Sequence, residues 1–156
     1  MQKITTFLWF DNQAEEAMQF YVSVFKQGRI LGMSRQGEQG AVISGTFELE
    51  GQQFMALNGG PYFSFTPAIS LFVDCETQQE VDDLWEKLSE GGAKQKCGWL
   101  TDRFGLSWQI IPRALGQLLQ DPDPARAERV RLAMLGMEKI DIEGLQRAHA
   151  GESPVG

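Results

Sequence analysis

The stretch from Ala68 to Gly91 reads AISLFVDCETQQEVDDLWEKLSEG and has the form of a strand followed by a helix. The run from Ile69 to Asp74 is rich in β-branched and aromatic residues, which favours a strand. Thr77 with Glu80 three residues later has the spacing of a capping box at a helix start. The apolar residues that follow recur on one helical face: Val81, Leu84, Trp85 and Leu88. The glycine that closes the stretch ends the predicted helix.

The N-terminal segment repeats this order of elements. A strand is predicted from Ile4 to Phe10, and Asn12 with Glu15 again has capping-box spacing. Gly28 ends the helix that follows. Its apolar face is formed by Ala14, Ala17, Met18, Tyr21, Val22 and Phe25. The chain therefore contains a duplicated strand-helix unit.

Short strands rather than further helices follow each predicted helix. They cover 29–35, 41–50 and 52–58 in the first copy and 93–97, 99–101 and 106–111 in the second. Gly51 and the stretch from Asp102 to Gly105 supply the turns of the last hairpins. The predicted fold is α+β, with two tandem βαβββ modules. Each module leaves one sheet face uncovered by its helix, so we expect the two open faces to form a sheet-lined cleft.

Beyond Pro112 the pattern is helical. Asp123 and Pro124 have the preferred arrangement for a helix start, Gly136 ends that helix, and another short helix is predicted from Asp141. The predicted domain organisation is one domain over residues 1–112, with modules at about 1–60 and 66–112, and a C-terminal helical extension over 113–156.

Four stretches have a distinctive wording: CGWLTDRFGLSWQIIP, FMALNGGP, DLWEKLSEGG and AMLGMEKIDIEGL. They resemble the PhnB-like family, often labelled demethylubiquinone 3-methyltransferase, within the vicinal oxygen chelate superfamily of glyoxalases, bleomycin-resistance proteins and dioxygenases. The resemblance implies the glyoxalase (vicinal oxygen chelate) fold. It also implies a homodimer, since relatives commonly pair and some complete their cleft across subunits.

The resemblance also indicates where metal ligands would stand. In metal-using members, one ligand comes from the first strand and one from the last strand of each module. These positions fall at Thr5, at Ala56 or Asn58, at Ala68 and at Gln109. None of these residues has a carboxylate, imidazole or thiolate donor, and the single histidine, His149, lies near the C-terminus. We therefore expect no metal site and no cofactor.

The uncharged polar and aromatic residues on the predicted open faces are candidate ligand-binding residues. The resemblance supplies Thr5, Asn58 and Gln109. If Thr5 and Gln109 face the cleft, alternation along the strands adds Phe7, Trp9, Ser70 and Phe72. The Gln109 amide both donates and accepts, and burying it unpaired would cost about 1–3 kcal/mol. Its hydrogen-bond partner could be a ligand, a side chain of the protein such as Asn58 or Thr5, or an ordered water.

The net charge and composition of the chain indicate which classes of binding partner to expect. The 156 residues have a formal net charge of −7, which disfavours nucleic acid, and neither a signal segment nor a membrane-spanning run is visible. We expect a cytoplasmic protein. Cys75 and Cys97 lack metal or redox spacing and are expected to be free thiols, although Lys94 and Lys96 near Cys97 favour a thiolate there.

Three functions are compatible with these patterns. The first is metal-independent binding of a small organic molecule in an aromatic cleft. The second is a small-molecule transferase, isomerase or lyase that uses Gln109 or Cys97. A typical nucleotide-like methyl-donor site has a glycine-rich turn between a strand and a helix, which neither NGGP nor SEGGAK provides. The third is a dimeric interaction module acting through the C-terminal helices.

Overall fold

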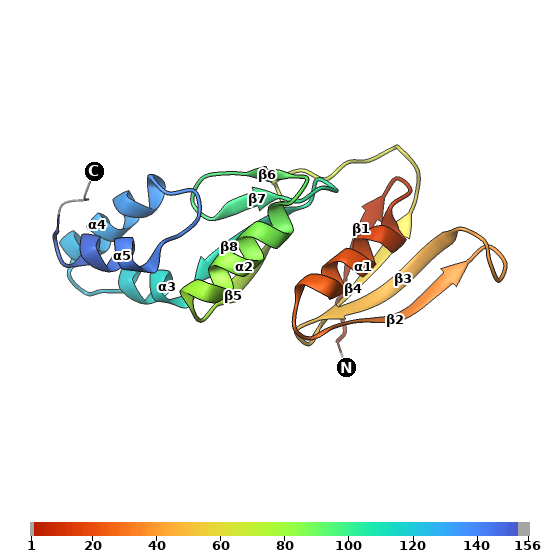
Figure 1. Cartoon of the computed structure of the whole chain (residues 1–156), viewed down its shortest axis with the longest axis horizontal. Helices are drawn as coiled ribbons and strands as arrows, with labels where there is room; N and C mark the ends of the chain where they lie inside the picture. The colour runs from red at the N-terminus through yellow and green to blue at the C-terminus, as the bar shows by residue number, and fades with distance from the viewer. Residues whose placement is uncertain (1, 153–156) are drawn as a thin grey trace. The chain divides into compact units, whose positions relative to one another are not determined.

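The computed structural model describes residues 2–152, which divide into unit 1, ending at Thr66, and unit 2, beginning at Pro67. Unit 1 contains β1 (Thr6–Phe10), α1 (Ala14–Val24), β2 (Gly28–Arg35), β3 (Val42–Leu49) and β4 (Gln52–Asn58). Unit 2 contains β5 (Ser70–Cys75), α2 (Gln78–Ser89), β6 (Ala93–Lys94), β7 (Trp99–Thr101), β8 (Ser107–Pro112), α3 (Arg113–Leu119), α4 (Pro124–Leu135) and α5 (Ile142–His149). Figure 1 shows this order of elements, which confirms the predicted α+β fold of two βαβββ modules.

The two sheets have the same topology. Their strand orders are β1-β4-β3-β2 and β5-β8-β7-β6, and in each the first and last strands of the module run parallel. The prediction that the two open faces line a common cleft stays a prediction. The final residues of the predicted extension, 153–156, lie outside the described residues.

In unit 1, α1 covers one face of the sheet. Leu8, Phe47 and Ala56 are buried on that face, where Phe47 stacks on Phe54 and on Tyr21 of α1. Phe7, next to Leu8 and therefore on the opposite face, is 50% exposed. The apolar core of unit 1 thus lies between the helix and one side of the sheet, and the other side is open.

The predicted capping box of α1 is wrong. The helix begins one residue after Gln13, which makes no side-chain cap. Instead, Oδ1 of Asn58 accepts a hydrogen bond from the backbone N–H of Ala14 at 2.8 Å, while Nδ2 of Asn58 donates to the carbonyl of Val42 at 3.0 Å. The cap therefore comes from the end of β4, a long-range partner that local spacing does not reveal.

In unit 2, the predicted capping box of α2 is confirmed, since Oγ1 of Thr77 accepts from the N–H of Glu80 at 3.2 Å. The side of the sheet toward α2 is buried, as Leu100, Trp108 and Ile110 are at most 2% exposed. Strand β6 is shorter than predicted. The chain at Cys97 pairs instead with the C-terminal extension, donating its N–H to the carbonyl of Met137 at 2.8 Å.

The C-terminal helices belong to unit 2 and share a core with the end of its sheet. The predicted helix starts are confirmed by Asp123, which accepts from the N–H of Ala125, and by Asp141, which accepts from that of Gly144. The shared core is formed by Ile111, Leu115, Val130, Ile140 and Leu145, with Leu118, Met134 and Met137 packed against it. Within residues 2–152, each helix is too short or too polar to cross a bilayer.

Candidate functional site

A row of three side chains crosses the open face of the unit 2 sheet. Gln109 on β8 lies between Phe72 on β5 and Trp99 on β7, because the strand registers pair it with both. These positions alternate with the buried residues that face α2, so the row lies on the opposite side of the sheet. Phe72 is 60% exposed, while Trp99 and Gln109 are half-buried.

Helix α3, at the start of the C-terminal extension, forms a wall beside this row. The wall and the row line an open pocket of about 490 Å³. Its lining comprises Phe72, Asp74, Cys97, Trp99, Gln109, Ile111, Pro112, Arg113, Leu115, Gly116, Gln117, Leu119, Gln120 and Met134. The volume falls in the range of small-molecule sites, which is roughly 300–1,000 Å³. The lining matches the composition of such sites, with apolar walls and few polar groups.

The Gln109 amide has a protein partner on its donor side. Its Nε2 donates to Oγ of Ser70 at 2.9 Å, so the sheet itself fixes the side chain. Within residues 2–152 this is the one hydrogen bond of the Gln109 side chain, and Gln109 is one of the residues that line the pocket. A group of the protein therefore satisfies the donor side of the amide, and ligand contact by Gln109 stays a prediction.

The charged residues of the pocket are paired with each other. Arg113 Nη2 lies 2.8 Å from Oδ2 of Asp74, and Nη1 lies 3.5 Å from a carboxylate oxygen of Glu76. The hydrogen bond to Asp74 raises the pKa of Arg113, so the guanidinium stays charged. Arg113 is thus shared by two carboxylates, and the other residues that line the pocket are uncharged.

The two cysteines differ in position. Cys75 is fully buried, and burial, followed by the charges of Glu80 and Asp74, raises the pKa of its thiol to about 12, so it stays protonated and unreactive at neutral pH. Cys97 lines the pocket and has a positive φ of 61°. Lys94, one of the two lysines near it, forms an ion pair with Glu86 at 2.8 Å.

The other candidate residues belong to unit 1 and are described within that unit. Phe7 and Trp9 are on the open face of their own sheet, and the indole of Trp9 donates to the carbonyl of Gly60 at 3.0 Å and packs edge-on against Phe63. Thr5 precedes β1, and its hydroxyl is 3.5 Å from Nε2 of Gln2. These three stay predictions as ligand contacts.

Asn58 requires a correction. It pairs with buried Phe10 on the face covered by α1, opposite to Phe7 and Trp9. Both ends of its carboxamide are hydrogen-bonded to the backbone of unit 1. The expectation that it shares a face with Phe7 and Trp9 is therefore wrong, because in parallel pairing it is Leu57 that lies beside Trp9.

Sequence reasoning missed Trp99 and the α3 wall. The strand 99–101 was predicted with its correct bounds, and alternation from Gln109 would have placed Trp99 on the open face. The sequence contains no comparable local signal for the α3 wall, because α3 is a short helix whose position depends on the core that it shares with α4 and α5. Within residues 2–152, no group of three His, Cys, Asp or Glu side chains is arranged to hold a metal ion.

Comparisons with known proteins agree with this fold. A structure described as a putative 3-demethylubiquinone-9 3-methyltransferase, the PhnB protein of Bacillus cereus, is 44% identical, with a TM-score of 0.67 over 71% of this chain and 99% of its own. Protein PA1353 of Pseudomonas aeruginosa is 21% identical, with a TM-score of 0.62 over 72% and 98% of the two chains.

A glyoxalase/bleomycin resistance protein/dioxygenase domain from Frankia sp. EAN1pec is 15% identical, with a TM-score of 0.51 over 72% of this chain and 92% of its own. It supports the glyoxalase-type fold alone. No curated protein matches the sequence. The sequence profile of the 3-demethylubiquinone-9 3-methyltransferase family matches residues 2–111. The chain therefore belongs to this PhnB-like family of proteins described as 3-demethylubiquinone-9 3-methyltransferases.

Proposed function

We propose that the protein binds a small, largely apolar organic molecule in the unit 2 pocket, without a metal ion. The observation that carries this proposal is the row of Phe72, Gln109 and Trp99, which lies on a sheet face next to the α3 wall. Apolar surface supplies the affinity in such a site, and a single fixed polar group orients the ligand. The sheet supports the row from behind, which keeps the site preorganised.

The free acceptor on Gln109 specifies the polar end of the ligand. A hydroxyl or N–H group on an otherwise apolar ring would donate to Oε1 of Gln109. The name of the family refers to demethylubiquinone, a ring that carries a hydroxyl group, and a ligand of this kind has the required donor. The paired charges of Asp74 and Arg113 favour a neutral ligand over an ionic one.

Native mass spectrometry of protein purified without chelators tests the proposal directly. A bound organic molecule on metal-free protein would support it, and near-stoichiometric metal would contradict the metal-independent part. The same spectrum gives the subunit count, which tests the predicted homodimer.

Point variants test the location of the site. With 1-naphthol as the probe, Phe72→Ala and Trp99→Ala should each weaken binding about tenfold, because each removes roughly 1–2 kcal/mol of apolar contact. Leu135→Ala is the matched control, since Leu135 is an exposed apolar residue of α4 that does not line the pocket. Equal affinities for all three variants and the unchanged protein would refute the assignment.

Methyl transfer to a hydroxylated ring is a second candidate, favoured by the family match and by the description of the Bacillus cereus relative. Within residues 2–152, no glycine-rich turn joins a strand to a helix, since Gly59 and Gly60 follow β4, and Gly91 and Gly92 follow α2. A donor would therefore need another mode of binding. Incubation of the protein with a catechol and a sulfonium methyl donor, followed by mass analysis for a methylated product, tests this candidate.

A further inference from the structure

The wall formed by the extension lies beyond the part of the chain that the family profile matches. The family profile ends at residue 111, whereas half of the lining residues come from Arg113 onward. Resting on the proposed function, we propose that the C-terminal extension selects the ligand of the pocket, and that Gly116 of α3 leaves space for a flat, neutral, hydroxylated aromatic ring system.

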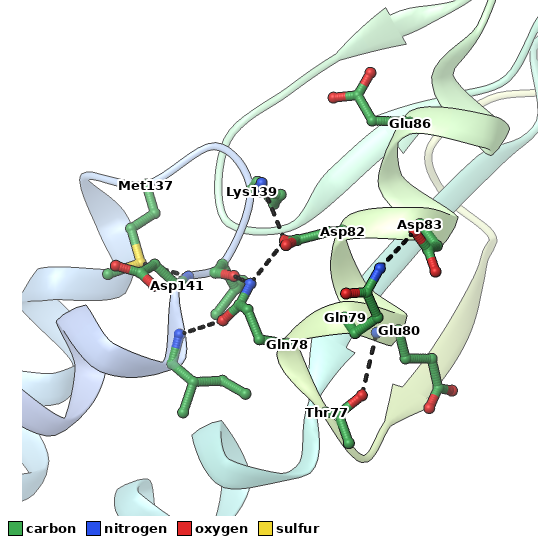
Figure 2. A network of polar contacts seen from close by, with 12 residues as sticks. Thr77, Gln78, Gln79, Glu80, Asp82, Asp83, Glu86, Met137, Lys139 and Asp141 are labelled. Carbon is green, nitrogen blue, oxygen red and sulfur yellow. Dashed lines mark hydrogen bonds and ion pairs between the residues drawn. The ribbon is translucent and has the colours of Figure 1, made fainter.

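Polar contacts hold the extension firmly against the second module. Figure 2 shows Gln78 at the start of α2, where its Nε2 donates to Oδ1 of Asp82 at 2.9 Å and to the carbonyl of Ile140 at 3.0 Å. Oε1 of Gln78 accepts from the N–H of Ile142 at 2.8 Å, and Lys139 forms an ion pair with Asp82 at 3.0 Å. One glutamine side chain thus bonds to the backbone on both sides of Asp141.

A second attachment lies on the other side of the extension. The N–H groups of Cys97 and Gly98 donate to the carbonyls of Met137 and Glu138, each at 2.8 Å. Gly98 has a φ of +81°, and a Cβ there would lie 2.8 Å from Cδ1 of Ile111 and 3.1 Å from Cγ1 of Ile140. The loop and the sheet approach so closely that this position requires glycine. The two attachments and the shared apolar core make the wall a fixed part of unit 2.

Gly116 is unusual within this fixed wall. A glycine inside a helix costs about 0.5–1 kcal/mol relative to alanine, so a helix of seven residues would be more stable without it. Packing does not explain the glycine, because a Cβ at this position would meet no atom within 4 Å. Gly116 lines the pocket instead, so its missing side chain enlarges the space beside the sheet.

The chemistry of the remaining lining defines the ligand class. Phe72 and Trp99 offer aromatic surface, which suits a flat ring, and Gln109 offers an acceptor for a hydroxyl group. Arg113 is paired with both Asp74 and Glu76, so it offers no unpaired positive charge to balance an anionic ligand. A neutral aromatic alcohol meets all three conditions.

Two substitutions of Gly116 distinguish an effect on the pocket volume from an effect on the stability of α3. Gly116→Ala should raise the melting temperature and keep most of the binding, while Gly116→Leu should fill the pocket. We expect Gly116→Leu to weaken 1-naphthol binding about tenfold or more, because the leucine side chain would take up space that the bound ring occupies. Phenol, with one ring, should lose less affinity. Ala125→Leu, which adds bulk at an exposed position of α4 outside the pocket, is the control and should bind like the unchanged protein.

The outcomes distinguish this inference from the function on which it rests. If the unchanged protein binds neither probe, the proposed pocket function fails and the inference fails with it. If the unchanged protein binds 1-naphthol and the folded Gly116→Leu variant binds both probes with unaltered affinity, the pocket function stands and the role of the extension is refuted. A circular dichroism melt shows that the variant is folded.

Discussion

The last hairpin of unit 1 turns at Glu50 and Gly51, which both have positive φ values, 49° and 85°. The corresponding hairpin of unit 2 turns at Asp102 to Gly105 and is held by a side chain. The carboxylate of Asp102 is 2% exposed and accepts from the N–H groups of Phe104 and Leu106 and from the indole of Trp108. The two modules share a topology, and both turns contain a glycine with positive φ, but in unit 2 a buried carboxylate also holds the turn.

The helix starts differ in the same way. In unit 1 the cap comes from Asn58, far along the chain, whereas in unit 2 it comes from Thr77, next to the helix. Only unit 2 carries the C-terminal helices, which add a wall to its open face. A duplicated fold therefore does not imply duplicated supporting contacts, and each module should respond to mutation in its own way.

The largest effect should come from breaking the unit 2 turn. Asp102→Ala would leave two backbone N–H groups and the indole N–H of Trp108 without this acceptor, at a cost of about 3–5 kcal/mol in unfolding free energy. Urea unfolding followed by tryptophan fluorescence measures the loss. Asp102→Asn is the control, because its oxygen can keep the two backbone bonds, and it should cost less. A loss below about 1 kcal/mol for Asp102→Ala would show that the carboxylate does not hold the turn.

The two helix caps should give effects of intermediate size. Asn58→Ala removes both the cap of α1 and the hydrogen bond to Val42, so we expect a cost of about 2–3 kcal/mol. Thr77→Ala removes one cap bond and should cost about 1 kcal/mol. Amide hydrogen exchange locates each loss, in α1 for the first variant and in α2 for the second. Equal costs for the two variants would contradict the difference between the modules.

The smallest effect should be a pH dependence at the attachment of the extension. The hydrogen bond from Gln78, and then the contact with Lys139, lower the pKa of Asp82 below its ordinary 3.8. A lowered pKa in the folded state contributes stability above the ordinary value, and this contribution disappears as the pH falls through the folded pKa. Because the Asp82 side chain is 41% exposed, we expect less than about 1 kcal/mol.

Acid titration of Asp82→Asn against the unchanged protein measures this contribution. The two proteins should differ in unfolding free energy at neutral pH and converge below pH 3.8, once the carboxylate is protonated. A difference that persists unchanged into acid would mean that the charge of Asp82 has no part in the attachment.

The elements of the fold were largely predictable because their signals are local. The bounds of β4 and β7 were predicted as observed, and Thr77, Asp123 and Asp141 cap the helices that they were expected to cap. The cap of α1 was not predictable from spacing, because its donor and acceptor are 44 residues apart.

The site was predictable only where strand alternation applies. That pattern correctly grouped Ser70, Phe72 and Gln109 on one face. It misplaced Asn58, since the parallel register between β1 and β4 is a tertiary property. The α3 wall depends on the packing of Leu115, Val130 and Leu145, which no local pattern encodes.

Amide chemical shifts recorded during a titration with 1-naphthol test the central claim most directly. The account predicts that the shifted signals belong to Phe72, Trp99, Gln109 and Gly116, which line one pocket from the sheet and from α3. A second hollow, between α4 and α5 and lined by Leu132, Met137 and Gly144, provides the internal comparison. Shifts confined to that hollow, or a titration without shifts, would contradict the claim that the pocket beside Gln109 is the ligand site.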